Sequence, residues 1–464
     1  MRAESPLHRR SFLRWSAASV AIGPAFQSLA ARIARADPAG LCSRGYGPLA
    51  PVKDRETGLE LIQLPEGFRY SSFGWTNEPQ FDGSPTPGAH DGMAVTHDQD
   101  GIVIMTRNHE IAAVGQAFGK PAITYDARAR GGCTNLMFDT KTGTWVKGWP
   151  GISGTVRNCA GGATPWGTWL TCEETTLGPR DEYEGQAFDY AETHGWIFEV
   201  PPLGDADPRP LKSMGRMWHE AVVLDPETGI AYETEDRDDA GFYRFLPATP
   251  QKLAEGGRLQ MLGARGKKVL KKGLRVGAVF DVDWVDIEDP MRTDSPNSRD
   301  HQGVYHQGRL AGGSTFARLE GVCYGRGKIY ITATSGGDAE RGQVWEFDPR
   351  GQTLTLVFES PGERVLDMPD NMCISPRGGI VLCEDGVSTP QRLHGLTEGG
   401  KLFTFAANNI DFTDTPFRSF AQKDYRSAEW CGATFSHDGQ WLFVNLQSPG
   451  VTFAITGPWE KGLI

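Results

Sequence analysis

Residues 158–174 read NCAGGATPWGTWLTCEE, and parts of this phrase recur along the chain. A polar residue precedes a short apolar segment, a turn follows at TPWG, and a second apolar segment ends in two glutamates. Apolar residues that alternate on both sides of a turn containing proline or glycine predict a β-hairpin. The other copies of the phrase indicate how such hairpins are combined.

Six segments share this pattern, and they begin at His90, Asn158, His219, Leu319, Asp370 and Glu429. Further strand signals lie between the copies, at 195–202, 241–247, 343–349 and 401–407, so that each unit offers roughly four strands. Four-stranded units that repeat radially form a β-propeller. The sequence therefore predicts an all-β fold, a six-bladed propeller. The alternative, a two-sheet sandwich, is disfavoured by six related units in so long a chain. The wide gap between the third and fourth copies predicts a long insertion within residues 250–316.

The N-terminal residues have the composition of an export signal. HRRSFLR at 8–14 is basic, a weakly apolar run follows, and ARA at 34–36 is a cleavage motif of small residues. The arginine pair resembles a twin-arginine (Tat) signal. Gly23, Pro24 and Gln27 interrupt the run, and this disfavours the alternative of a membrane anchor. We therefore expect a Tat signal peptide at 1–36, export by the Tat machinery to the periplasm or outside the cell, and one propeller domain at 37–464.

The overall charge restricts the partners of the protein. Of 464 residues, 58 are acidic and 47 are Lys or Arg, which gives a net charge of −11. This balance argues against nucleic acid or an anionic membrane as the main partner. The sequence also lacks a G-x-S-x-G elbow, a Walker loop, an H-E-x-x-H motif and a dinucleotide fingerprint. A serine hydrolase and a nicotinamide enzyme are therefore disfavoured.

In a propeller, the residue just before the innermost strand of each blade is expected to face the mouth of the central channel. In the six copies this position gives Asp91, Cys159, Glu220, Glu320 and Asn371, with Glu429 loosely aligned. Carboxylates that converge on one axis repel one another unless a cation lies between them. An oxygen-rich set suits calcium, and one thiolate favours a transition metal.

The second strands of the copies end in further acids, which are Glu173, Glu174, Glu235, Asp236, Glu384 and Asp385. The alternative interpretation is that these acids are solvated strand ends. Arg157 and Arg318 each lie two residues before a predicted ligand, where a guanidinium could bind a tetrahedral oxyanion. They could equally be surface arginines in salt bridges. The roles of His109 and His219 stay open.

These motifs together resemble the PhoX-type alkaline phosphatases. The resemblance rests on the Tat-like signal, NCAGGATPWGTWLTCEE, HE at 219–220, RLEG at 318–321, PDN at 369–371 and CEDG at 383–386. It implies a six-bladed propeller with an iron–calcium cluster at one mouth that hydrolyses phosphate monoesters. The residues it implies are Cys159 as the iron thiolate, Glu220, Glu320, Asp370, Asn371, Glu384 and Asp385 as metal residues, and Arg318 as a phosphate-binding arginine. We add Glu174 to the predicted metal ligands and Arg157 to the predicted catalytic arginines.

Two other functions remain compatible with the sequence. One is a calcium-dependent propeller lactonase of the gluconolactonase kind, which also places acids and Asn at the channel mouth. The other is an exported propeller that binds a ligand or partner and holds calcium only for stability. Iron in the purified protein would count against the lactonase.

Overall fold

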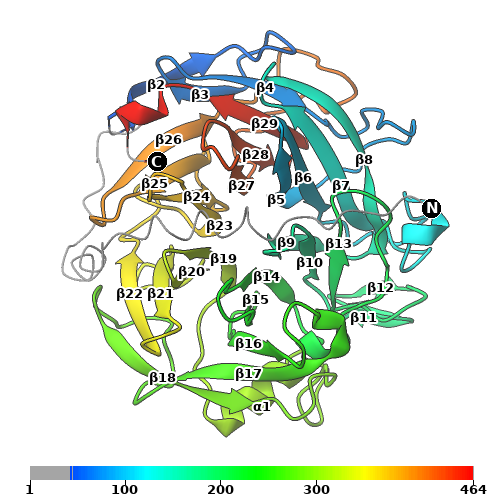
Figure 1. The fold of residues 1–464 in the computed structure, drawn as a ribbon, viewed down its shortest axis with the longest axis vertical. Coiled ribbons are helices and arrows are strands. Elements are labelled where there is room, and N and C mark those ends of the chain that lie inside the picture. The colour runs from blue at the N-terminus through cyan, green and yellow to red at the C-terminus, as the bar shows by residue number, and fades with distance from the viewer. Residues whose placement is uncertain (1–41, 44, 463) are drawn as a thin grey trace, which may run out of the picture.

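A computed structural model describes residues 42–43, 45–462 and 464. The predicted signal peptide at 1–36 lies outside the described residues. The regular secondary structure of the described residues is almost entirely β-strand, and the strands are arranged in sheets around a common centre (Figure 1). In the described residues no helix is both long enough and apolar enough to cross a membrane.

The sheets are antiparallel. One contains β5 (His90–Gln99), β6 (Ile102–His109), β7 (Gly131–Asp139) and β8 (Thr144–Thr155). The next contains β9 (Asn158–Ala163), β10 (Trp169–Glu173) and β13 (Ile197–Val200), beside the small hairpin of β11 (Asp181–Tyr183) and β12 (Gln186–Phe188). Another contains β27 (Trp430–Phe435), β28 (Leu442–Leu446), β29 (Val451–Thr456) and β4 (Arg69–Phe73).

Two larger sheets complete the circle. One runs β14 (His219–Leu224), β15 (Ala231–Glu235), β16 (Phe242–Pro247), β17 (Gly257–Ala264), β18 (Val279–Asp286), β22 (Thr353–Glu359), β21 (Gln343–Asp348), β20 (Lys328–Ala333) and β19 (Leu319–Gly325). The other runs β1 (Cys42–Ser43), β2 (Gly47–Val52), β3 (Ile62–Pro65), β26 (Leu402–Asn408), β25 (Arg392–Leu396), β24 (Ile380–Glu384) and β23 (Pro369–Ile374). The helices are α1 (Gly303–Ala311) and the short η4 (Pro121–Ile123), η5 (Lys212–Met214), η6 (Leu253–Glu255) and η7 (Trp459–Lys461).

The strands β5, β9, β14, β19, β23 and β27 are the innermost strands, and each contacts the next around a closed circle. Figure 1 shows them gathered at the centre, with the later strands of each unit further out. This arrangement is a β-propeller, so the predicted architecture is confirmed at this level. The circle is closed by β4, an early strand of the chain, which pairs with β29 near its end through residues such as Tyr70 and Ile455.

The apolar core lies between neighbouring sheets and not on the axis. One cluster of buried residues, for example, joins Val103 and Phe138 of β6 and β7 to Phe443 and Ala454 of β28 and β29. Such sheet-on-sheet packing buries one face of each sheet against the next. Because the side chains between sheets supply the core, the axis is free to hold polar residues.

The segment 250–316, where the sequence predicts an insertion, contains β17, β18 and α1. The strand β18 pairs with β17 on one side and with β22 on the other, and it thereby joins the units of the third and fourth copies into one sheet. The chain between β18 and α1 returns toward the axis and contributes Asp300 and His301 to contacts there.

Candidate metal centre

The six innermost strands begin in the same way. The first residue of each strand pairs with a residue at or near the end of the second strand, as in Asn158↔Glu173 and Pro369↔Glu384. The next residue is therefore equivalent in all six repeats, and we call this the ring position. The ring residues are Asp91, Cys159, Glu220, Glu320, Asp370 and Cys431.

The register corrects two of the sequence alignments. Pro369 pairs with Glu384, so the ring residue of β23 is Asp370 and not Asn371. In β27, Trp430 pairs with Leu446, so the ring residue is Cys431, and Glu429 lies two positions earlier. A break in register follows the ring position in most of these strands, for example between His219 and Val222. Such β-bulges change the direction of a side chain, and they are frequent beside active sites.

Small residues follow the ring position because neighbouring innermost strands come very close together. A Cβ on Gly92 would lie 2.5 Å from the Cα of Ala160, and one on Gly321 would lie 2.4 Å from the carbonyl oxygen of Asp370. Neither distance is sterically possible, so only glycine fits these two places. This close approach brings the ring residues of adjacent repeats within reach of one another.

A second layer of acids lies above the ring. The residues just past the second strands are Glu110, Glu174, Asp236 and Asp385, while Thr334 takes this place in the fourth repeat and Gln447 in the last. The Nε2 of Gln447 donates to Asp91 (3.3 Å), Glu110 (2.9 Å) and Glu429 (2.7 Å). Carboxylates from separate repeats therefore converge on one mouth of the propeller, which we define as the end where the innermost strands begin.

The carboxylates of this site are buried and short of partners. Asp91 and Glu220 each have one buried oxygen without a hydrogen bond among the described residues. Burial, reinforced by neighbouring carboxylates, raises the pKa of both groups well above the ordinary range. The same two causes raise the pKa of the Cys159 thiol. Buried carboxyl and thiol groups at such short separation either take up protons or bind a cation, and a metal ion would supply the positive charge that lets them ionise.

The donor atoms form overlapping groups that suit metal ions. The Cys159 sulfur lies with oxygens of Asp91 and Glu110 in one group, and with oxygens of Glu174 and Glu220 in another. The donor atoms within each group are within 4.8 Å of one another. A thiolate among carboxylates suits a transition metal such as iron, and the further carboxylate oxygens of the mouth suit calcium. The residues present therefore fit a mixed centre, and the unpartnered oxygens of Asp91 and Glu220 fit it best.

The two predicted arginines lie beside these acids. The Nη2 of Arg157 lies 3.1 Å from Glu110 and 2.8 Å from Glu174. Arg318 binds Asp236 through two nitrogens, at 2.9 and 3.1 Å, and also pairs with Glu320. Both arginines have a left-handed backbone, with φ of 47° and 44°. This conformation is costly for a residue with a side chain and is concentrated at functional sites.

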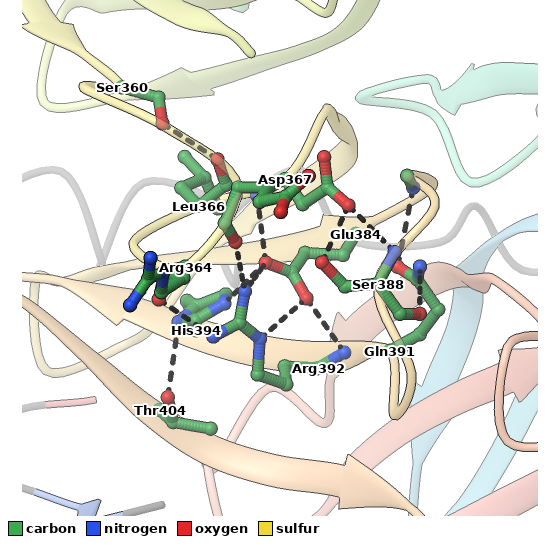
Figure 2. Close-up of polar contacts among 12 residues, drawn as sticks. Ser360, Arg364, Leu366, Asp367, Glu384, Ser388, Gln391, Arg392, His394 and Thr404 are labelled. Carbon is green, nitrogen blue, oxygen red and sulfur yellow. Dashed lines mark hydrogen bonds and ion pairs between the residues drawn. The ribbon is translucent and has the colours of Figure 1, made fainter. Parts of the chain in front are cut away.

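Glu384 lies outside these groups of donor atoms, and the prediction that it is a metal ligand is wrong. Its oxygens accept from Arg392 N, Nε and Nη2 (2.9, 2.9 and 2.7 Å), from His394 Nε2 (2.9 Å) and from Asp367 N (2.9 Å). Figure 2 shows Arg392 and His394 directed at this carboxylate. Burial alone would raise its pKa, but His394 and Arg392 hold it below the ordinary value. No lone pair remains for a metal.

The same division occurs in the other acid pairs. Glu173, the partner of Glu174 in sequence, accepts from Val156 N and Gly195 N at 2.8 Å and bonds His194 at 2.6 Å. Successive side chains of a strand point to opposite sides. The first acid of each pair therefore fixes the backbone beside the ring, and the second faces the mouth.

Three other predicted or open residues have structural roles. Asn371 donates to Asp370 Oδ1 (2.8 Å) and accepts from Gly432 N (2.9 Å), so its amide links β23 to β27. His109 is buried and bonded to Gly88 O and Thr134 Oγ1, both at 2.9 Å. His219 is buried and bonded to Gly215 O at 3.0 Å.

Replacing Glu384 by glutamine tests its structural role. The change leaves the buried Arg392 and His394 without a carboxylate, so we expect the free energy of unfolding to fall by about 3 kcal/mol. Denaturant unfolding of the variant measures this loss. The control is Glu340→Gln, an exposed acid beside Lys272, where we expect a change below about 0.5 kcal/mol. Loss of bound metal from a variant of unchanged stability would contradict this assignment.

Some residues of the site were not in the predicted ligand set. Asp91 and Glu429 were noted only at the strand starts, and Asp236 only as an acidic strand end. Glu110 and Cys431 were not predicted at all. Glu110 occupies the same place in its repeat as Glu174, and Cys431 occupies the same place as Asp91 and Cys159, but finding these equivalences requires counting through the bulges.

The fold and the site together define a propeller with a buried acidic and thiol-containing centre at one mouth. The family described as alkaline phosphatase PhoX matches residues 44–148 and 140–450. The chain belongs to this family, which confirms the resemblance read from the motifs. It is accordingly a phosphoric ester hydrolase, and membership implies dependence on metal ions.

Comparison with curated proteins finds no match. Two solved structures are similar in fold. A protein assigned provisionally as a gluconolactonase is 11% identical, with a TM-score of 0.38, over 88% of this chain and 97% of its own. The WD40 β-propeller domain of Doa1 is 9% identical, with a TM-score of 0.39, over 85% of this chain and 99% of its own.

Proposed function

We propose that the protein is an exported phosphatase that hydrolyses phosphate monoesters at an iron–calcium centre in the mouth of a six-bladed propeller. The observation that carries this proposal is the convergence of Cys159 with Asp91, Glu110, Glu174 and Glu220. The six equivalent innermost strands support a count of six blades, with one innermost strand in each blade. The Tat-like sequence at 1–36 supports export to the periplasm or beyond.

In this proposal Cys159 holds iron together with carboxylates on either side of it. Its sulfur is the soft donor of a set that otherwise consists of oxygens, and a soft donor selects a transition metal. Asp91 and Glu220 are suited to complete the set because each has an oxygen with no other partner. Glu320, Asp370 and Asp385 lie on the other side of the ring, where an all-oxygen set suits calcium.

The bound metals supply positive charge and Lewis acidity, which draw an anionic ester to an otherwise acidic mouth. The protein positions the phosphate. Arg157 and Arg318 are each about one quarter exposed, with side-chain exposures of 27% and 28%, so they can reach both the acids below them and a ligand above. Their Nε and Nη2 atoms are engaged by the carboxylates, and their Nη1 groups, which have no such partner among the described residues, can donate to phosphate oxygens. They stabilise the negative charge that grows on the non-bridging oxygens as the ester bond breaks.

Hydrolysis of p-nitrophenyl phosphate by natively exported protein tests the proposal. We expect activity that depends on calcium and falls at least tenfold when a chelator removes the ion, because the arginines alone do not offset the clustered acids. Metal analysis of the same sample should find iron. A lactonase would hydrolyse lactones and contain no iron. A binding propeller would hydrolyse neither substrate, and either result would overturn the proposal.

A further inference from the structure

A wall of aromatic and cationic side chains stands at one side of the mouth. Trp218 precedes the first residue of β14, and the guanidinium carbons of Arg157 and Arg237 lie 5.2 and 4.3 Å from the centre of its ring. Tyr183 contacts the same ring edge-on at 5.4 Å, and His301 lies 5.9 Å from Tyr183. Arg237 therefore lies next to Arg157, one of the two arginines proposed to bind phosphate, and Trp218 contacts both Arg157 and Arg237.

Arg237 differs from Arg157 and Arg318 in its ionic partners. Arg157 and Arg318 are each paired with two carboxylates. Arg237 makes no ion pair with a carboxylate among the described residues, and the one hydrogen bond of its side chain to these residues runs from Nη2 to the carbonyl oxygen of Asp300 (3.1 Å). A guanidinium has five N–H donors. Most of its donors and its full charge are therefore free for a ligand.

The predicted insertion holds this wall in place. Its residues 294–302 form a tight turn in which backbone amides bind the carboxylates of Asp294 and Asp300. The turn is fixed to the mouth by three hydrogen bonds, from Arg237 to Asp300 O (3.1 Å), between Thr176 and His301 (2.7 Å), and from Gln302 to Asp239 O (3.0 Å). The carboxylate of Asp239 is itself bound to Lys271. Asp239, Asp294 and Asp300 are thus engaged with other groups, and Arg237 is held in a defined direction.

Arg237 is also tied to the phosphate site through the backbone. Its carbonyl oxygen accepts from Arg318 N at 2.9 Å, and it directly follows Asp236, which binds the Arg318 side chain. A phosphate held between Arg157 and Arg318 would therefore present its leaving group to the wall that Arg237 belongs to.

We propose that Arg237 is a specificity-determining residue that binds a second anionic group on the leaving group of the ester. This inference rests on the proposed phosphatase function. The substrates it favours are phosphate monoesters whose leaving group carries a carboxylate or a further phosphate, preferably on a planar ring that can pack against the partly exposed Tyr183.

Two matched substrates test the proposal, phenyl phosphate and 4-carboxyphenyl phosphate, which differ only in the second anionic group. In the wild-type holoenzyme we expect a higher kcat/KM for the carboxylated ester. In Arg237→Ala its kcat/KM should fall about tenfold or more, which is the effect of losing one charge-assisted contact, while that for phenyl phosphate changes less than about twofold. Arg237→Lys should recover part of the difference, because it keeps the charge without the fork.

Arg309→Ala is the control, because Arg309 is a half-buried arginine of α1 that makes no ion pair among the described residues. It should leave the ratio of the two kcat/KM values unchanged. Equal losses for both esters in Arg237→Ala, or no loss for either, would overturn the assignment of Arg237 and leave the phosphatase function intact. A wild-type protein that hydrolyses neither ester would overturn both.

Discussion

Cys159→Ala is expected to lose its iron and to hydrolyse phosphate monoesters at least about a hundredfold more slowly than the wild type. The thiolate is the donor shared by two of the groups of ligand atoms, so its removal weakens both at once. The protein should remain folded, because the Cys159 side chain is only partly buried and contributes little to the core. Iron analysis, turnover of p-nitrophenyl phosphate and thermal unfolding measure the three parts of this prediction.

The matched control is Cys323→Ala. Cys323 is equally a free, partly buried cysteine of an innermost strand, but its sulfur lies against Met372, at 3.2 Å, and away from the ring. We expect the control to retain iron and activity within about twofold, since it removes one small apolar contact. Full activity and iron in Cys159→Ala would contradict the role given to the thiolate. A variant that fails to fold would be replaced by Cys159→Ser, which keeps the volume but offers a hard oxygen donor.

The propeller architecture could be predicted from the sequence because the sequence contains six related repeats. Six hairpins with a common opening phrase allow few other arrangements, and Cys159, Glu220 and Glu320 occupy the same place in that phrase. These three residues are also ring residues in the structure. Local pattern and three-dimensional position agree here because an alternating strand fixes the side to which each residue points.

The parts that could not be predicted involve bulges and adjacent acids. A bulge adds one residue without a partner, so equivalence along β23 and β27 cannot be counted from the letters alone. Glu384 and Asp385 are neighbours of similar chemistry, yet one binds Arg392 and His394 inside a blade while the other faces the mouth. The partners of Glu384 lie eight and ten residues away in the sequence, and only the folded sheet brings them to it.

Arg318→Ala is expected to lower kcat/KM for p-nitrophenyl phosphate by about a hundred- to a thousandfold. Arg318 pairs with Asp236 and Glu320 below the mouth and retains an exposed portion above it. Its loss removes a paired donor whose contact strengthens as charge moves onto the phosphate oxygens. The loss should appear mainly in kcat, because a contact made in the transition state affects kcat more than substrate binding. Arg318→Lys should recover part of the rate, since it keeps the charge but not the fork.

The appropriate control is Arg265→Ala. Arg265 also binds a carboxylate through two nitrogens, at 2.7 and 2.6 Å from Asp283, but it lies on the exposed sheet of the insertion. If binding to a carboxylate were the whole role of Arg318, both variants would show only the small stability loss of an ion pair. A large loss of kcat in Arg318→Ala, with iron and calcium retained and with Arg265→Ala at wild-type activity, therefore isolates the contact with the substrate. Equal activity of the two variants would instead assign Arg318 to balancing the acids of the ring.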